Sequence, residues 1–485
     1  MSKHNKRLPI LAVAFLSFVT AASPALASKF KDPALNGNLK EPIRTKQLVE
    51  GEYSQNLEAA SYFQQGVTRY NRGDFPGAAN FFRKALDFDP SIAMAYYLLG
   101  NSLFQQGQTE QATQEYRTAL SINPNMPEAY YNLGLTLYRQ GNINDAIALY
   151  QRALSLKGDL APARYNLALA YEAQGRTQEA LTQYNEAIRI DPNYDVAQYN
   201  LGLLLAKQNQ TEPAITALKQ AISSNPKSAL AHYQLGLLLA KQGQLKEAAQ
   251  ALKTSTELDP KFAPAQFQLG RVYNDLGAYS AASARFEEVT KLEPTNAQAF
   301  QQLGAALTQD GKNDRATVAL KTAVQLQPSD AMTYYNLGVA LQQDKKYAEA
   351  IAQYQQAILL NPSMSDAFYN TGVSLVQSGR RDEGISLLLQ ARKMFSEQGK
   401  ANKVMEVDQY VQNLAAQPTT IPAIVQPILP AGTPTQPSNI PTQPLLQPSN
   451  LPTQPLPQPS NTQTQPFMLP PRSNPFLLAP PGGTR

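Results

Sequence analysis

The 34 residues PEAYYNLGLTLYRQGNINDAIALYQRALSLKGDL, at positions 127–160, contain the pattern that decides the fold. Tyr130, Leu133 and Gly134 are spaced i, i+3 and i+4, which places them on one face of a helix. Gly141 then interrupts the helix, and apolar residues at helical spacing return after it. We therefore predict a hairpin of two helices, each of about 14 residues.

This pattern occurs ten times at a constant period of 34 residues, without insertion or deletion. A fixed period of this length indicates a solenoid of stacked helical units. The predicted units are 59–92, 93–126, 127–160, 161–194, 195–228, 229–262, 263–296, 297–330, 331–364 and 365–396. One column of small residues runs through all of them: Gly66, Gly100, Gly134, Ala168, Gly202, Gly236, Gly270, Gly304, Gly338 and Gly372.

The small-residue column needs a packing reason, because glycine inside a helix costs about 1 kcal/mol relative to alanine. We expect it to let the two helices of a unit approach closely, against a second column of small residues that begins at Ala78. Proline ends the second helix in eight units. Gly158 replaces it at the third boundary and is expected to act as a C-cap.

The two ends of the array differ. The pattern of residues 397–416 predicts an amphipathic capping helix. Its apolar side would cover the end of the solenoid and its polar side would face solvent. Its apolar side is expected to carry Val404, Val407, Val411 and Leu414. Residues 28–58 are polar, and Leu48, Tyr53 and Leu57 are candidates for packing on the first unit.

The spacing of Tyr130, Leu133-Gly134, Ala146, Tyr150 and Ala153 resembles the tetratricopeptide repeat family over residues 59 to about 396. The resemblance implies an all-α, right-handed superhelical solenoid of ten antiparallel helix pairs. Its first helices would line a concave groove. It also implies that the partners are proteins or extended peptides.

The resemblance also implies that two columns just before the glycines point into that groove. The amide column is Asn132, Asn166, Asn200, Gln234, Gln268, Gln302, Asn336 and Asn370, preceded by Gln64. The aromatic column is Tyr97, Tyr131, Tyr165, Tyr199, Tyr233, Phe267, Tyr335 and Tyr369, preceded by Phe63 and interrupted by Gln301. Side-chain amides donate hydrogen bonds to a peptide backbone and accept hydrogen bonds from it, and proline rings pack on aromatic faces. The columns are similar to the asparagine ladder of protein O-linked N-acetylglucosamine transferases. The alternative interpretation is structural: each Asn or Tyr supports the neighbouring unit.

Charge argues against acidic or nucleic-acid partners. The chain has a formal net charge of +5, and residues 1–27 contribute three of its basic residues and no acidic one. The remainder is close to neutral, so it lacks a field that would attract nucleic acid. Arg139, Lys207, Lys241 and Arg271 are too scattered along the groove positions to clamp a carboxylate.

Residues 1–27 read as a secretory signal peptide. Lys3, Lys6 and Arg7 precede an apolar stretch, and Ala25-Leu26-Ala27 forms a small-residue cleavage site. An uncleaved anchor is the alternative. The chain has no cysteine, so it is not a lipoprotein and no disulfide supports its core. We expect a periplasmic or extracellular location.

No catalytic, cofactor or metal site emerges from the sequence. The chain has two histidines, His4 in the leader and His232 in a helix, where it replaces a packed aromatic. A metal site is not expected from one histidine without cysteine. Phosphate-loop, dinucleotide and nucleophile-elbow motifs are absent. We therefore predict that the chain is not an enzyme and takes no cofactor.

Residues 417–485 form a tail rich in Pro, Gln, Thr and Ser, with 19 of the 36 prolines. This composition predicts disorder with polyproline-type character. Three roles stay open: a spacer, a docking arm through the Pro-Phe motifs at 466–467 and 475–476, or a ligand for the chain's own groove.

The leading functional hypothesis is a non-catalytic scaffold outside the cytoplasm, which assembles an envelope, secretion or polysaccharide-export complex. A chaperone for unfolded periplasmic segments is the first alternative. An accessory subunit of an enzyme complex is the second.

Overall fold

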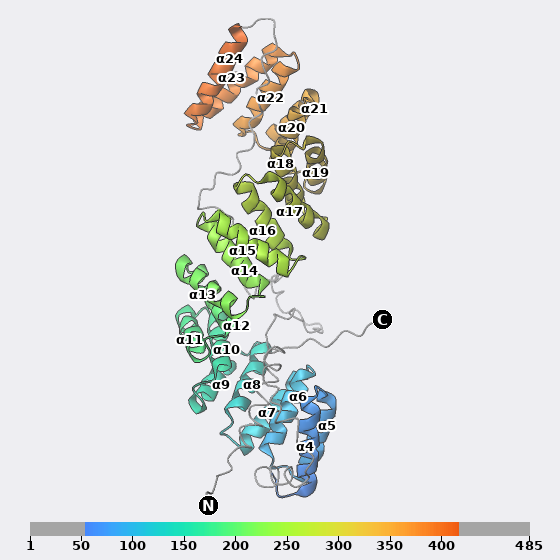
Figure 1. Ribbon diagram of the computed structural model, residues 1–485, viewed down its shortest axis with the longest axis vertical. Coiled ribbons are helices and arrows are strands. Elements are labelled where there is room, and N and C mark those ends of the chain that lie inside the picture. The colour runs from blue at the N-terminus through green and yellow to red at the C-terminus, as the bar shows by residue number, and fades with distance from the viewer. Residues whose placement is uncertain (1–53, 417–485) are drawn as a thin grey trace, which may run out of the picture. The chain divides into compact units, whose positions relative to one another are not determined.

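The computed structural model describes residues 54–416, and this region is entirely helical apart from its turns (Figure 1). The first helices of ten pairs are α4 (Leu57–Asn71), α6 (Ala93–Gln105), α8 (Pro127–Arg139), α10 (Ala161–Ala173), α12 (Asp195–Lys207), α14 (Ala229–Lys241), α16 (Ala263–Asp275), α18 (Ala297–Gln309), α20 (Ala331–Gln343) and α22 (Ser365–Gln377). Their partners are α5 (Phe75–Phe88), α7 (Thr109–Ile122), α9 (Ile143–Leu156), α11 (Thr177–Ile190), α13 (Thr211–Ser224), α15 (Leu245–Leu258), α17 (Tyr279–Leu292), α19 (Asn313–Leu326), α21 (Tyr347–Leu360) and α23 (Arg381–Glu397). A last helix, α24 (Ala401–Ala416), follows. The predicted all-α solenoid of paired helices is confirmed.

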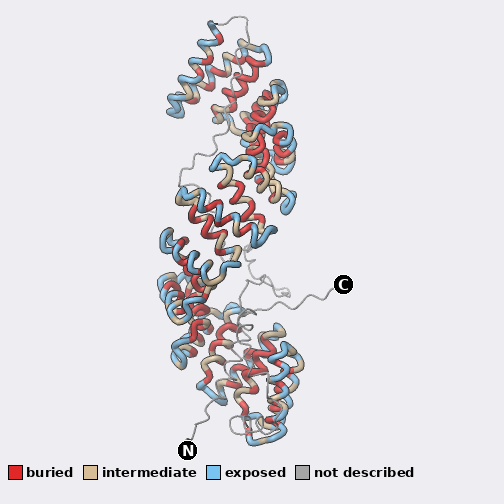
Figure 2. Tube along the Cα trace, in the orientation of Figure 1, coloured by how far each residue is buried: buried red, intermediate tan, exposed pale blue. Residues whose placement is uncertain are grey.

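The chain forms two compact parts, residues 54–201 and residues 202–416, and the boundary between them in the sequence falls within α12. Within each part, a first helix packs against its own partner, and that partner packs against the next first helix. Consecutive first helices also touch, as α6 does with α8 and α18 with α20. Buried residues therefore gather where helices face each other, and exposed residues line the turns and outer faces (Figure 2).

The glycine column makes room for a large side chain from the second helix of the same pair. A Cβ at Gly338 would lie 2.5 Å from the Tyr354 ring, and one at Gly304 would lie 2.3 Å from Leu320. The carbonyl oxygen of Ala146, in the small-residue column, lies 3.3 Å from the corresponding point at Gly134. The two helices of a pair therefore approach closely, as the sequence predicted. The space beside each glycine is filled by a large side chain of the second helix, and these side chains are Phe82, Tyr116, Tyr150, Tyr184, Leu218, Leu252, Phe286, Leu320, Tyr354 and Leu388.

The second helices end at the same repeat position whether proline or glycine follows. α9 ends at Leu156, and its C-cap is Lys157 in extended conformation, with φ −143° and ψ 94°. Gly158 does not adopt a positive φ, so its predicted role as a C-cap was wrong. Only α23 runs longer, to Glu397, because Ser396 replaces the proline that would end it.

The C-terminal helix caps the array as its pattern predicted. Val407 and Leu414 of α24 are buried against α22 and α23, together with Tyr410, while Val404 and Val411 are partly buried. Arg392 of α23 forms an ion pair with Asp408, and the Arg381 side chain donates a hydrogen bond to the Leu414 carbonyl. The opposite face of α24 is exposed, which terminates the apolar core.

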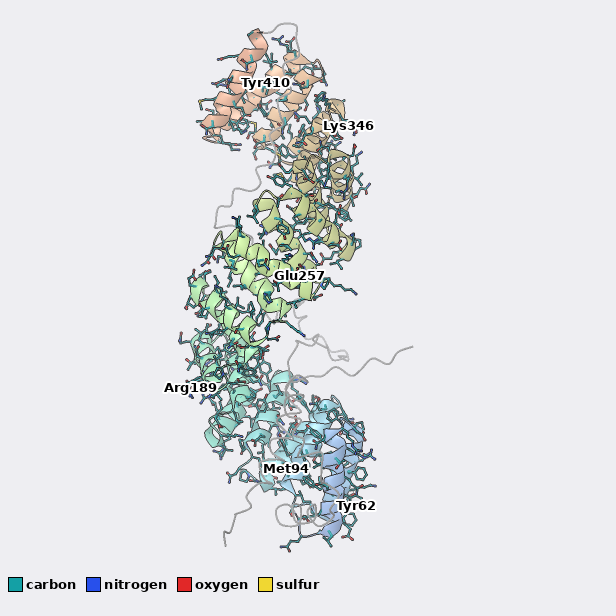
Figure 3. The ribbon with its side chains drawn as sticks, viewed as in Figure 1. Tyr62, Met94, Arg189, Glu257, Lys346 and Tyr410 are labelled. Atoms are coloured by element: carbon teal, nitrogen blue, oxygen red, sulfur yellow. The ribbon has the colours of Figure 1, made fainter. Side chains whose placement is uncertain are left out.

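The N-terminal edge differs from its prediction. Leu57 is 50% exposed, so its expected packing on the first unit was wrong. The Asn56 side chain instead caps α4 by accepting from two backbone amides. Tyr62, labelled in Figure 3, stacks on Phe88 with ring centroids 5.5 Å apart. Leu48, Tyr53, the predicted signal peptide and the proline-rich tail lie outside the described residues.

Candidate functional site: the first-helix ladder

The aromatic and amide columns meet across consecutive pairs in the N-terminal part. The Asn166 side chain donates a hydrogen bond of 2.9 Å to the Tyr131 hydroxyl, 35 residues earlier. Asn200 donates to the Tyr165 hydroxyl at the same distance. Both asparagines and both tyrosines are buried. Each bond therefore joins one first helix to the next and satisfies two groups that water does not reach.

The first step of this ladder is a small network. Asn132 donates to the Tyr97 hydroxyl at 3.2 Å and to the Asn101 carbonyl oxygen at 2.7 Å. The Tyr116 hydroxyl of α7 donates to the same oxygen at 2.8 Å. The network ties α6, α7 and α8 together. Sequence reasoning missed Asn101, because nothing in its column marks it as polar and buried.

Tilted aromatic contacts with the second helices also hold these tyrosines in place. The ring centroids of Tyr97 and Tyr116 lie 6.1 Å apart, and those of Tyr165 and Tyr184 lie 6.0 Å apart. Burial raises the pKa of the Tyr131 hydroxyl, and the bond from Asn166 opposes this only in part. These tyrosines remain neutral donors and acceptors at ordinary pH. In this part of the chain, the columns support neighbouring units, as the structural interpretation expected.

The ladder lacks these bonds from α14 to α18. Gln234 is 0% exposed, yet neither atom of its amide has a hydrogen-bond partner. Gln268 and Gln302 are half-buried, and within residues 54–416 they make no side-chain hydrogen bond. Burying an unpaired amide costs about 1 to 3 kcal/mol. The fully buried Gln234 amide therefore carries this cost, whereas the amides of Gln268 and Gln302 are only partly buried and remain accessible.

The residue types explain the missing bonds. Phe267 has no hydroxyl to offer Gln302. Gln268 is one methylene longer than the asparagines, and Tyr233 instead packs edge-on against Phe262, with centroids 4.9 Å apart. Burial raises the pKa of Tyr233 to about 12. Gln301, which interrupts the aromatic column, donates to Thr333 at 2.9 Å and also to Asp330.

The ladder resumes at the C-terminal end. Asn370 donates to the Tyr335 hydroxyl at 3.0 Å, and the Tyr369 hydroxyl donates to Glu406 of α24 at 3.4 Å. Asn336 is buried, and its carbonyl oxygen has no partner. Tyr199 is half-buried on α12. The predicted site residues thus fall into bonded and unbonded stretches, a division that their columns alone did not reveal.

His232, the histidine within the described region, has a structural contact. One ring nitrogen lies 3.2 Å from the Pro226 carbonyl oxygen. Gln198 and Gln266, at the same repeat position, donate to the carbonyls of Pro192 and Pro260. This position therefore satisfies a carbonyl at the end of the preceding helix pair. Within residues 54–416, no group of three or more His, Cys, Asp or Glu side chains is arranged to hold a metal.

Family models for tetratricopeptide repeats match most of this array. One described as TPR repeat matches residues 66–107, 100–141 and 304–345. Others, described as tetratricopeptide repeat, match 125–193, 199–261, 239–307 and 331–364. Together they span more than half of the chain. The protein is a tetratricopeptide repeat protein. Arrays of this family are protein–protein interaction scaffolds, usually non-catalytic, that bind proteins or peptides.

Solved structures similar to this tetratricopeptide repeat protein include bacterial proteins of the same family. YrrB, described as having an unusual peptide-binding site, is 24% identical, covering 38% of this chain and 95% of its own, with a TM-score of 0.36. MamA from Desulfovibrio magneticus RS-1 is 24% identical, covering 35% and 96%, with a TM-score of 0.33. PilF of Pseudomonas aeruginosa is 20% identical, covering 43% and 94%, with a TM-score of 0.37. The curated proteins gave no match.

None of the helices between residues 54 and 416 combines the length and the hydrophobicity that crossing a membrane requires.

Proposed function

We propose that the array is a non-catalytic scaffold that binds extended, uncharged peptide segments along its first helices from α14 to α18. The observation that carries the proposal is the glutamine stretch of Gln234, Gln268 and Gln302, whose amides lack partners among residues 54–416. A primary amide offers two donors and one acceptor, which match both polar groups of a peptide bond. Binding a peptide backbone would satisfy the half-buried amides of Gln268 and Gln302 without requiring a particular side-chain sequence, whereas Gln234 is fully buried and lies beneath the binding surface.

The surroundings favour a neutral ligand. α18 has no charged residue in its 13 positions, and the charged residues of α16 are Arg271 and Asp275, one of each sign. Phe267, next to Gln268 in the sequence, is only half-buried, and a partly exposed aromatic side chain suits proline rings. A charged peptide would lose hydration beside α18 without gaining a partner of opposite sign on that helix. The preferred ligand class is therefore an uncharged segment rich in Pro, Gln, Ser or Thr.

The test is a binding titration with a fluorescent peptide of about twelve alternating Pro and Gln residues, compared with one carrying Glu in place of Gln. Replacing Gln268 and Gln302 together by alanine should weaken binding of the neutral peptide on the order of tenfold, because two hydrogen bonds are lost. Gln250→Ala with Gln325→Ala, at two exposed second-helix positions, is the matched control and should bind as the parent does. Equal affinity for all three proteins, or preference for the acidic peptide, would sink the proposal.

We also propose that the scaffold acts outside the cytoplasm, in the periplasm or beyond the cell, where it assembles an envelope, secretion or polysaccharide-export complex. Support comes from the charged start, apolar stretch and Ala25-Leu26-Ala27 site at the N-terminus. Expression of the full chain in a bacterium followed by N-terminal sequencing should give a mature protein that begins at Ser28. A chain retained in the cytoplasm with Met1 intact would contradict this location.

A chaperone for unfolded segments is the second candidate, and the same observation favours it. Glutamine amides bind backbone and not a defined side chain, so they tolerate many sequences. The lifetime of the complex with the partner distinguishes a scaffold from a chaperone. Purification of the native chain with one stoichiometric partner supports the scaffold, whereas many weakly held clients support the chaperone.

A further inference from the structure

The first helices near the C-terminus carry few charged residues. α18 and α20 carry no charged residue at all, and α22 carries only Asp366. The partner α19 differs, with Asp314, Arg315 and Lys321. On the first helices, Gln298 and Met332 are exposed, while Gln301, Gln302 and Gln343 are half-buried. We name the side chains of these five residues the neutral face; one of them, Gln301, donates to the carboxylate of Asp330 at the start of α20.

The chain leaves the described region close to this face. Arg381, at the start of α23, donates to the Leu414 carbonyl near the end of α24. Three residues separate α22 from α23, so the end of α24 lies beside the end of α22. Consecutive first helices pack side by side at about 8 to 10 Å. From α22 to α18 there are two such steps, or roughly 20 Å.

The sequence that follows has the matching chemistry. No Asp, Glu, Lys or Arg occurs between residues 417 and 471. Its first portion, QPTTIPAIVQPILP at 417–430, places Ile421, Ile424, Val425 and Ile428 among four prolines and a threonine pair. Fourteen residues at about 3.1 Å each reach roughly 40 Å when extended. This exceeds the distance required.

We propose that residues 417–430 bind the neutral face as an intramolecular ligand and compete with outside peptides for the amides of α18. The proposal rests on the proposed function, since it assigns a regulator to the same amides. Tethering gives the segment an effective concentration in the millimolar range. Weak contacts are therefore sufficient to keep the face occupied until a better ligand displaces the segment.

Photo-crosslinking of the full-length chain tests this placement. A benzoylphenylalanine at Gln302 should crosslink to residues 417–430 within one molecule, with a yield independent of protein concentration. The same group at Val318, 68% exposed on α19, is the matched control and should not reach the tail. The proposal is overturned by no tail crosslink from position 302, by equal yields from both positions, or by a yield that rises with concentration.

A second pair of full-length variants separates this inference from the proposed function. Ile424→Asp with Ile428→Asp should reduce the crosslink several-fold and tighten binding of the neutral Pro-Gln peptide on the order of tenfold. Leu446→Asp with Leu451→Asp places the same charges further along the tail and should change neither. If the peptide binds all variants equally, the inference fails while the proposed function stands. If the crosslink forms but no variant binds peptide, the inference stands and the proposed function fails.

Discussion

The tyrosine–asparagine ladder from α6 to α12 and the glutamine stretch from α14 to α18 occupy the same two repeat positions, yet their amides differ in what they bind. Asn166 and Asn200 donate to tyrosine hydroxyls of the preceding pair. Gln268 and Gln302 have no such bond within the described helices. An amide that joins two helix pairs therefore differs by one methylene, or by the hydroxyl of its partner ring, from an amide that makes no hydrogen bond within the described helices.

The same contrast extends to the second helices. Tyr116, Tyr150 and Tyr184 pack beside the small-residue column in α7, α9 and α11. The equivalent residues of α13, α15 and α19 are Leu218, Leu252 and Leu320. The N-terminal part thus buries many ionisable hydroxyls, and the glutamine stretch buries few.

The largest expected difference is therefore in alkaline stability. Burial raises the pKa of Tyr116, Tyr150 and Tyr184 well above 10, so their stabilisation is complete below pH 10 and is lost as pH rises towards the folded-state values. At pH 11, each such tyrosine removes about 1.4 kcal/mol of stability, because the unfolded state ionises first.

Urea unfolding followed by circular dichroism at pH 8 and pH 11 measures this loss. Tyr150→Leu should reduce the loss of unfolding free energy between pH 8 and pH 11 by the contribution of one tyrosine. Because the Tyr150 hydroxyl has no hydrogen-bond partner, the substitution removes no hydrogen bond. Tyr347→Leu, at a half-buried position, is the control. An identical loss for parent and Tyr150→Leu would show that these hydroxyls do not govern alkaline stability.

The next effect is on local stability at neutral pH. Asn166→Ala leaves the Tyr131 hydroxyl buried without its partner, which should cost about 1 to 3 kcal/mol. Gln302→Ala breaks no protein hydrogen bond and should cost less than about 0.5 kcal/mol. Hydrogen exchange of the helices flanking each site gives the local free energy of opening. Equal costs at the two positions would remove the distinction between the two stretches.

Sequence predicted the helices well because the 34-residue period fixes which residues are apolar neighbours. The two columns also lie on the first helices as expected. What sequence did not reveal is the bond across 35 residues from Asn166 to Tyr131, since it depends on the offset between stacked pairs. The column of bulky residues that packs against the glycines, which includes Tyr150, lies sixteen residues after each glycine in the sequence. That these side chains contact the glycines could be seen only from the way the two helices of a hairpin pack.

The smallest expected effect comes from converting one stretch into the other. Phe267→Tyr combined with Gln302→Asn recreates the pair found at Tyr131 and Asn166. It should stabilise α16 and α18 by about 0.5 to 1.5 kcal/mol, the net value of one hydrogen bond. Peptide binding should weaken at the same time, because one amide is now engaged. A double-mutant cycle over the two positions checks the coupling, and additive single-variant effects would contradict it.

The most direct test of the central claim observes the amides themselves. The full-length chain, with nitrogen-15 in its Gln and Asn side chains, is titrated with the neutral Pro-Gln peptide. The side-chain resonances of Gln268 and Gln302 should shift with peptide concentration, while those of Asn166 and Asn200 should stay unchanged. Shifts confined to the asparagines, or equal shifts in both stretches, would contradict it.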